Sequence, residues 1–157
     1  MQVKICGITL IDDALVAADA GADALGLIFY EGSPRGIDVE QARKIVRAVP
    51  PYTTVTALFV NPERSLVERV LKAVPISQLQ FHGNESAEFC RGFERPYVKS
   101  IAVSTDNGMQ QVIGEHWASR AFYSTRWSRV STGVPEKPLI GQKYRRKMLD
   151  IGSWRVG

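Results

Sequence analysis

Four residues with reactive or ion-binding side chains stand at the ends of short apolar runs. They are Cys6, Arg35, Asn61 and His82. A cysteine can act as a base or a nucleophile, and a guanidinium is well suited to binding an anion. If the apolar runs are parallel strands, their carboxyl ends meet at one edge of the sheet. We therefore expect these side chains to converge on one pocket, supplying a base or nucleophile and an anion ligand.

Each of these side chains also has a purely structural interpretation. Cys6 is compatible with a small buried side chain, Arg35 with a solvated surface charge, and His82 with a hydrogen bond inside its loop. Cys90 lies within a helical pattern and is predicted to pack in the core. Cys6 and His82 alone do not define a Cys/His pair of known geometry. No spacing of His, Cys, Asp and Glu predicts a metal site.

The elements that must position these residues alternate from residue 2 to about residue 103. Gly21 ends the first helical pattern, Asp38 is a suitable N-cap for the second, and Pro62 suits the first turn of the third. Repeated strand and helix patterns predict parallel strands joined by crossover helices. The short repeat, and the absence of a Gly-x-Gly-x-x-Gly turn after the first strand, favour a (β/α)₈ barrel over an open doubly wound sheet. The predicted strands are residues 3–6, 24–29, 54–60, 78–81 and 97–103, and the predicted helices are residues 12–20, 39–49, 63–74 and 86–93.

The composition indicates an ordinary globular domain. The chain has 157 residues, of which 45% are hydrophobic and 23% are charged, and this length allows one domain with a substantial core. It has no apolar run of about 18 residues and no signal-peptide pattern, so we expect neither a membrane span nor secretion. Two cysteines do not make a disulfide framework, which favours a reducing, cytoplasmic location.

The net charge of +4 is distributed unevenly along the chain. Residues 1–123 carry 12 Lys/Arg and 14 Asp/Glu, whereas residues 124–157 carry 8 Lys/Arg and 2 Asp/Glu. A basic tail is one sign of nucleic-acid binding. The tail's single basic cluster, residues 143–147, has sparse aromatic interleaving, so we expect no nucleic-acid partner. We therefore divide the chain into a body, residues 1–123, and a divergent basic tail, residues 124–157.

Four motifs of the body are similar to those of one known family. The motifs are KICGIT, DALVAADAGADALGLIFYEGSPRGI, ALFVN and LQFHGNES, in that order. Together they resemble phosphoribosylanthranilate isomerase of tryptophan biosynthesis, from residue 3 to about residue 123. The resemblance implies an α/β protein of the (β/α)₈ TIM-barrel family, here an incomplete barrel of about five to six βα units.

The resemblance also implies a reaction. In this family N-(5-phosphoribosyl)anthranilate undergoes an Amadori rearrangement to 1-(o-carboxyphenylamino)-1-deoxyribulose 5-phosphate, without a cofactor or a metal. A general acid protonates the ring oxygen as the furanose opens, and a general base then removes the C2′ proton. The resemblance implies that Cys6 is the base and that Arg35 holds the aminobenzoate carboxylate. His82 is expected to line the pocket, and Lys4 and Asn61 are further substrate-binding candidates.

The resemblance stops at the tail. The family's general-acid aspartate and its glycine-rich phosphate loops do not appear after about residue 120. The codons permitted for residues 123–157, read in one alternative frame, allow four of the missing motifs in the family's order. We therefore interpret the tail as a frameshifted translation that starts at or just after Tyr123.

Two expectations follow for the chain as written. Without the acid and the phosphate loop, we expect impaired isomerase activity. The alternative function is a non-catalytic partial barrel that binds a sugar phosphate or a partner chain. An incomplete barrel also has two open sheet edges, which would permit self-association.

Overall fold

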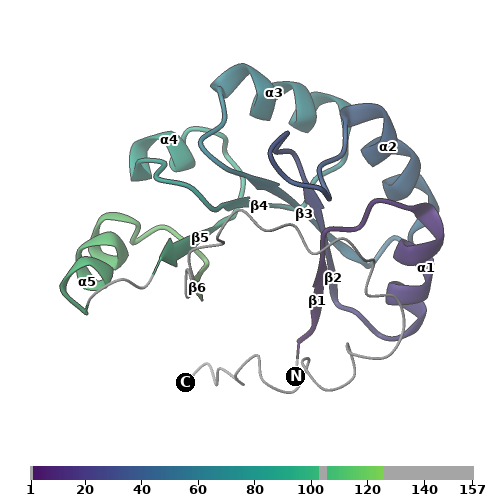
Figure 1. Ribbon diagram of the computed structural model, residues 1–157, viewed down its shortest axis with the longest axis horizontal. Coiled ribbons are helices and arrows are strands. Elements are labelled where there is room, and N and C mark those ends of the chain that lie inside the picture. Colours follow the sequence, from purple (N-terminus) through teal and green to yellow (C-terminus); the bar gives the residue numbers. More distant parts are fainter. Residues whose placement is uncertain (1, 103–105, 126–157) are drawn as a thin grey trace. The chain divides into compact units, whose positions relative to one another are not determined.

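A single parallel sheet organises the chain. The computed structural model describes residues 2–102 and 106–125, all within one compact unit of residues 2–127 (Figure 1). Its six strands lie in chain order, and each pairs in parallel with the next. The strands are β1 (Lys4–Cys6), β2 (Ala24–Ile28), β3 (Thr54–Phe59), β4 (Gln78–Phe81), β5 (Tyr97–Ala102) and β6 (Ala121–Thr125). The helices are α1 (Ile11–Asp19), α2 (Val39–Ala48), α3 (Arg64–Ala73), α4 (Ala87–Arg91) and α5 (Asp106–Glu115).

The predicted alternation of five strands and four helices is confirmed, with differences at element ends. The Asp38 side chain caps α2 by accepting a hydrogen bond from the backbone N–H of Gln41 at 2.7 Å. Pro62 does not lie in the first turn of α3, as predicted, because the N-cap is Glu63. The helix predicted at residues 86–93 is shorter, because it ends at Arg91 with Gly92 as its C-cap.

Two further elements complete the described chain. Helix α5 was not predicted, because its sequence, DNGMQQVIGE, has two glycines and only a weak apolar pattern. Strand β6 extends the sheet by a sixth strand and ends at Thr125. The rest of the predicted basic tail lies outside the described residues, and the change of reading frame, which concerns the gene, stays a prediction. No helix in the described ranges is long and apolar enough to cross a membrane.

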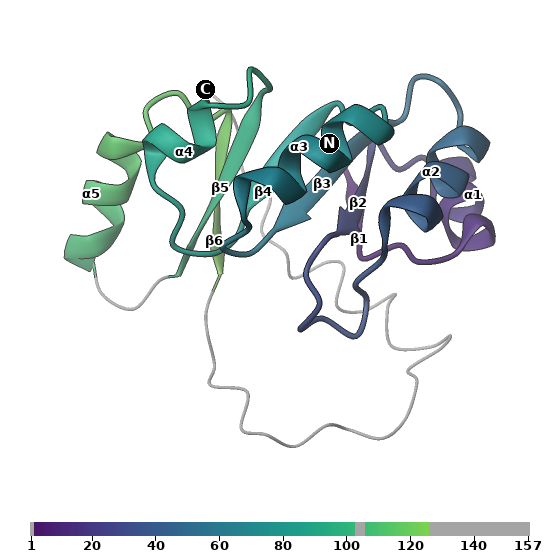
Figure 2. The ribbon, with the colours of Figure 1, turned by 90° about the horizontal axis from the view of Figure 1, so that it is seen from above.

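The hydrophobic core lies between the sheet and its helices. Figure 2 shows the helices beside the sheet, and along β2, β3 and β4 every second side chain belongs to the core. Cys90 of α4 is 0% exposed, which confirms its predicted packing role. The strands and helices contribute Leu25, Leu27, Val55, Ala57, Phe59, Leu79, Phe81, Ala42, Ile45, Val67 and Val70, among others.

A row of aromatic rings crosses the sheet near the carboxyl ends of three successive strands. The rings of Phe29 and Phe59 stack with centroids 5.5 Å apart, and those of Phe59 and Phe81 stack at 6.2 Å. Phe59 and Phe81 are also register partners. This row fixes the ends of β2, β3 and β4 relative to one another, which sets the positions of the loops that follow.

Several alternate side chains of the strands are polar and bind one another across the sheet. Lys4 Nζ of β1 donates to Gln80 Oε1 of β4 at 2.6 Å. Gln80 Nε2 in turn donates to Ser100 Oγ of β5 at 3.1 Å. Thr56 Oγ1 of β3 bonds to Gln78 Oε1 of β4 at 3.3 Å. Because Lys4 and Cys6 are two residues apart on one strand, they share this polar face.

Candidate active site

Cys6 is the last residue of β1 and lies opposite Gly26 of β2. The backbone N–H groups of Gly7 and Ile8 both donate to the carbonyl oxygen of Gly26, at 2.8 and 3.1 Å. Gly7 has φ of 84°, which turns the chain sharply out of the strand. The thiol is therefore fixed at the carboxyl end of β1, where the sequence predicts it, and it is partly exposed.

Arg35 reaches Cys6 from the loop that follows β2. Its Nη1 donates to the carbonyl oxygen of Cys6 at 2.8 Å. The guanidinium passes directly over Gly7, where an added Cβ would lie 2.5 Å from Nη1. Within the described residues this carbonyl is the one hydrogen-bond acceptor of the Arg35 side chain, which is exposed. The remaining guanidinium donors can bind an anion beside the thiol.

Asn61 belongs to a second group, which is built around a buried ion pair. Oε1 of Glu85 accepts hydrogen bonds from the backbone N–H groups of Asn61 and Gly83, at 2.8 and 3.0 Å. Oε2 of Glu85 pairs with Lys99 Nζ at 3.0 Å, and Lys99 also donates to the Gly83 carbonyl oxygen at 2.6 Å. The Asn61 side chain accepts from the backbone N–H of Asn84 at 2.7 Å. This network joins the loops after β3 and β4 to β5.

His82 follows β4 and feels the charges of Lys99, Glu85 and Lys4. Its backbone N–H donates to the Phe59 carbonyl oxygen at 2.9 Å, and its buried Nδ1 has no hydrogen-bond partner among the described residues. Burial lowers the pKa of His82, and the positive charges of Lys99 and Lys4 lower it further, against an opposing effect of Glu85. The imidazole is therefore neutral at pH 7.

The structure thus divides the predicted site residues into two groups of contacting residues, and Lys4 forms a separate link across the sheet. Cys6 and Arg35 form the first group, and Asn61 joins the loop that carries His82. Lys4 spans from β1 to β4 through Gln80.

Sequence reasoning missed Glu85, Lys99 and Gln80, although two of them carry a signal. A lysine inside the apolar strand YVKSIA requires a buried partner, and Glu85 directly follows the turn after His82. Which carboxylate pairs with this lysine depends on the fold, so the sequence does not name the pair.

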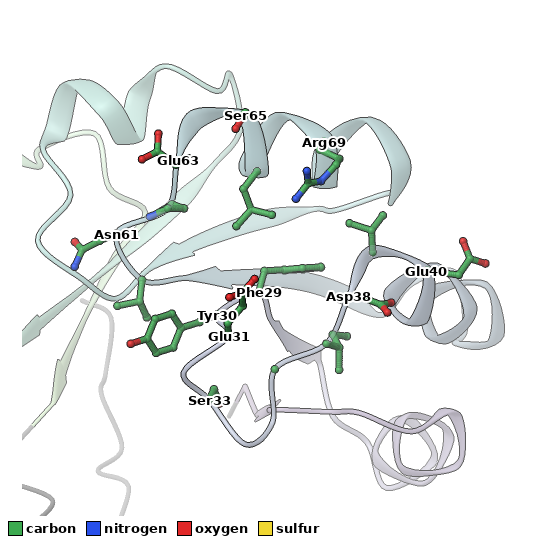
Figure 3. A pocket seen from close by; sticks show the side chains of 16 residues that line it. Phe29, Tyr30, Glu31, Ser33, Asp38, Glu40, Asn61, Glu63, Ser65 and Arg69 are labelled. Atoms are coloured by element: carbon green, nitrogen blue, oxygen red, sulfur yellow. The ribbon is translucent and has the colours of Figure 1, made fainter.

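A cavity lies elsewhere, between the loops after β2 and β3 (Figure 3). It measures about 1060 Å³, and Asn61 lines it whereas Cys6, Arg35 and His82 do not. The carboxylates in its lining are Glu31, Asp38, Glu40 and Glu63, and the one positive side chain is Arg69. This charge disfavours an anionic ligand, so we place the candidate active site at the strand ends beside Cys6. No cluster of His, Cys, Asp or Glu within the described ranges is arranged to hold a metal ion.

Comparison with known proteins identifies relatives of this chain. The family model for N-(5'-phosphoribosyl)anthranilate isomerase matches residues 3–120. The N-(5'-phosphoribosyl)anthranilate isomerase of Neisseria gonorrhoeae is 56% identical over 105 residues, which are 67% of this chain and 50% of the relative. The chain therefore spans about half the length of the curated relatives it matches.

Solved structures agree with the sequence match. Phosphoribosyl anthranilate isomerase from Thermotoga maritima superposes with a TM-score of 0.76 and 32% identity, over 85% of this chain and 66% of that chain. A second isomerase structure, in complex with reduced 1-(o-carboxyphenylamino)-1-deoxyribulose 5-phosphate, gives a TM-score of 0.74 and 34% identity, over 82% and 67% of the two chains. The fold prediction of an incomplete TIM barrel is thereby confirmed, and the chain belongs to the N-(5'-phosphoribosyl)anthranilate isomerase family.

Proposed function

We propose that the strand-end site of this chain serves the isomerisation of N-(5'-phosphoribosyl)anthranilate in tryptophan biosynthesis. The observation that carries the proposal is the hydrogen bond from Arg35 Nη1 to the carbonyl oxygen of Cys6, which holds a guanidinium at the residue that carries the thiol. A related isomerase binds the reduced product, which contains an aromatic carboxylate and a phosphorylated sugar. A small anionic conjugate of this kind suits a guanidinium next to a base. The cytoplasm, where phosphorylated metabolites are made and used, is the proposed location.

Cys6 is proposed as the general base. After the furanose opens to a Schiff base, the thiolate takes the C2′ proton and forms a neutral thiol. The C–H electron pair forms the new C=C bond while the C=N π pair of the Schiff base moves onto nitrogen, giving an enolamine that tautomerises to the ketone. Substrate and product are isomers, so the proton is returned and no other reactant is consumed.

Of the other predicted residues, Arg35 is proposed to bind the substrate directly. Arg35 would pair with the anthranilate carboxylate, and this pairing would anchor the aromatic half of the substrate next to the thiol. His82 is proposed to line the pocket as a neutral ring, because burial lowers its pKa. Lys4 and Asn61 are already bound inside the protein, which favours a role in holding the site rather than in direct contact.

The proposal is tested with the 157-residue chain and two cysteine variants. Substrate turnover is followed by chromatography, and binding of the reduced product is measured by calorimetry. We expect Cys6→Ala to abolish turnover and to leave binding nearly unchanged, whereas Cys90→Ala should affect neither. Arg35→Ala should weaken binding about tenfold or more, since hydrogen bonds to charged groups contribute about 1.5–3 kcal/mol. Equal turnover by the Cys6→Ala chain would refute the role of the thiol.

The chain's own turnover is a separate part of the proposal. Loss of a general acid lowers rates by about 10²- to 10⁴-fold, so we expect turnover well below that of the full-length relatives. Binding of the reduced product with no turnover at all would favour the alternative function, a sugar-phosphate-binding partial barrel.

We also propose self-association through the sheet edges. In the described residues β1 pairs with β2 alone and β6 with β5 alone, so each has one side without a strand neighbour. Light scattering that finds a monomer at all concentrations would contradict this.

A further inference from the structure

Gly26 occupies a position where its backbone does not require glycine. It lies inside the buried strand β2, and its φ is not positive, whereas among the described glycines Gly7 and Gly21 have positive φ. Glycine inside a strand weakens it relative to other residues and often marks a place where another group approaches closely. The reason for a glycine at position 26 must therefore lie in the atoms that surround it.

That space is filled by Cys6. A Cβ added at Gly26 would lie 2.7 Å from the Cys6 sulfur, 3.1 Å from its Cα and 3.2 Å from its Cβ. These three nearest atoms all belong to Cys6, and the sulfur is the closest. Because Cys6 and Gly26 are register partners, the thiol lies flat against the backbone of the neighbouring strand.

We propose that Gly26 is a positioning residue for Cys6. Because Gly26 has no side chain, it leaves a space beside β2 that holds the Cys6 sulfur, and we call this space the seat of the thiol. The carbonyl of Cys6 is held by a hydrogen bond from Arg35. Together these contacts fix both the backbone and the sulfur at the end of β1. A methyl group at position 26 would force the thiol into another rotamer, away from β2. The role in catalysis rests on the proposed function, whereas the seat itself can be tested by thiol chemistry alone.

The first test compares Gly26→Ala with Gly114→Ala in the full chain. Gly114 lies in α5 with no atom within 4 Å of its added Cβ, so it controls for glycine replacement as such. Cys6 alkylation by iodoacetamide is followed by peptide mass spectrometry. Cys90 is an internal control, because it is 0% exposed and burial raises its pKa to about 12.

We expect faster alkylation of Cys6 in the Gly26→Ala chain, since a sulfur that leaves its contact with β2 becomes more accessible. The increase should be about threefold or more, the size that a change in rotamer preference produces. Gly114→Ala should leave the Cys6 rate unchanged. Cys6 rates that are equal in all three chains would overturn the proposal, whatever the outcome of the isomerase assay.

A second test keeps the proposal falsifiable if Gly26→Ala folds poorly. The same substitution is made in Cys6→Ala and Cys6→Ser chains, and urea unfolding midpoints are compared. The drop in midpoint caused by Gly26→Ala should be largely relieved in Cys6→Ala, which has no γ atom. It should persist in Cys6→Ser, which keeps one. An equal drop in all three backgrounds, or failure of the Cys6→Ala/Gly26→Ala chain to fold, would show that Cys6 does not occupy the seat.

Discussion

Replacing Lys99 by methionine should be among the most destabilising single changes at the strand ends. The side chains of Lys99 and Glu85 are 4% and 2% exposed, and their charged atoms lie 3.0 Å apart. Methionine keeps most of the apolar stem of the lysine but removes the ammonium group, so Glu85 is left as a buried carboxylate without its cation. Removing one partner of a buried ion pair costs about 3–5 kcal/mol in the free energy of unfolding. The Gly83 carbonyl oxygen also loses its 2.6 Å hydrogen bond from Lys99 Nζ.

A double variant separates the lone charge from the loss of hydrogen bonds. Glu85→Gln retains a carbonyl oxygen that can accept from the backbone N–H groups of Asn61 and Gly83, as Oε1 does now. The Lys99→Met/Glu85→Gln chain contains no unpaired buried charge, so its destabilisation should be smaller than the sum of the two single effects.

Urea unfolding followed by circular dichroism measures these differences. Lys72→Met, an exposed lysine near the end of α3, is the control and should change stability by about 0.5 kcal/mol or less. The reasoning is refuted if Lys99→Met is no more destabilising than Lys72→Met, or if the two single effects add in the double variant.

Three further predictions concern other parts of the structure. Burial lowers the pKa of His116 below its usual value of about 6.5. As pH falls, His116 is therefore protonated in the unfolded chain before it is protonated in the folded chain, and the free energy of unfolding should fall below about pH 6.5. His116→Phe should reduce this pH dependence in unfolding measured between about pH 5.5 and 7.5. Arg64→Ala should lower the free energy of unfolding by about 1–2 kcal/mol in urea titrations, because the guanidinium lies over an aromatic ring. Gly7→Ala should destabilise more than Gly21→Ala in the same assay, since both have positive φ but an added Cβ strikes Arg35 at Gly7 alone; equal effects would contradict the close approach.

The sequence predicted most of the fold because each element has a local signal. Apolar β-branched runs are typical of buried parallel strands, and Asp38 and Gly21 mark helix ends. The end of α4 was misjudged because Phe89 and Phe93 continue a helical spacing, although Phe93 packs in the core from outside the helix. Hydrophobic spacing reports burial, and burial does not by itself decide where a helix stops.

The candidate site could be predicted only in part. The motifs placed Cys6 and Arg35 at strand ends, but the bond from the guanidinium to the Cys6 carbonyl depends on the turn at Gly7. The pairing of Lys99 with Glu85 depends on the loop after β4 folding back toward β5. Contacts of this kind join residues that are distant in sequence, and no local pattern specifies them.

The chain order of the strands also has a consequence for synthesis. Because each strand pairs with the strand before it in the chain, the sheet can grow at one edge as the polypeptide leaves the ribosome. At about 5–20 residues per second, Lys99 emerges on the order of ten seconds after Cys6. The β1–β2 pair, with the thiol seated on Gly26, can therefore form before Gln80 and Lys99 exist. In the nascent chain the strand pair that positions Cys6 would form first, and the hydrogen bonds made by Gln80 and Lys99 would form afterwards.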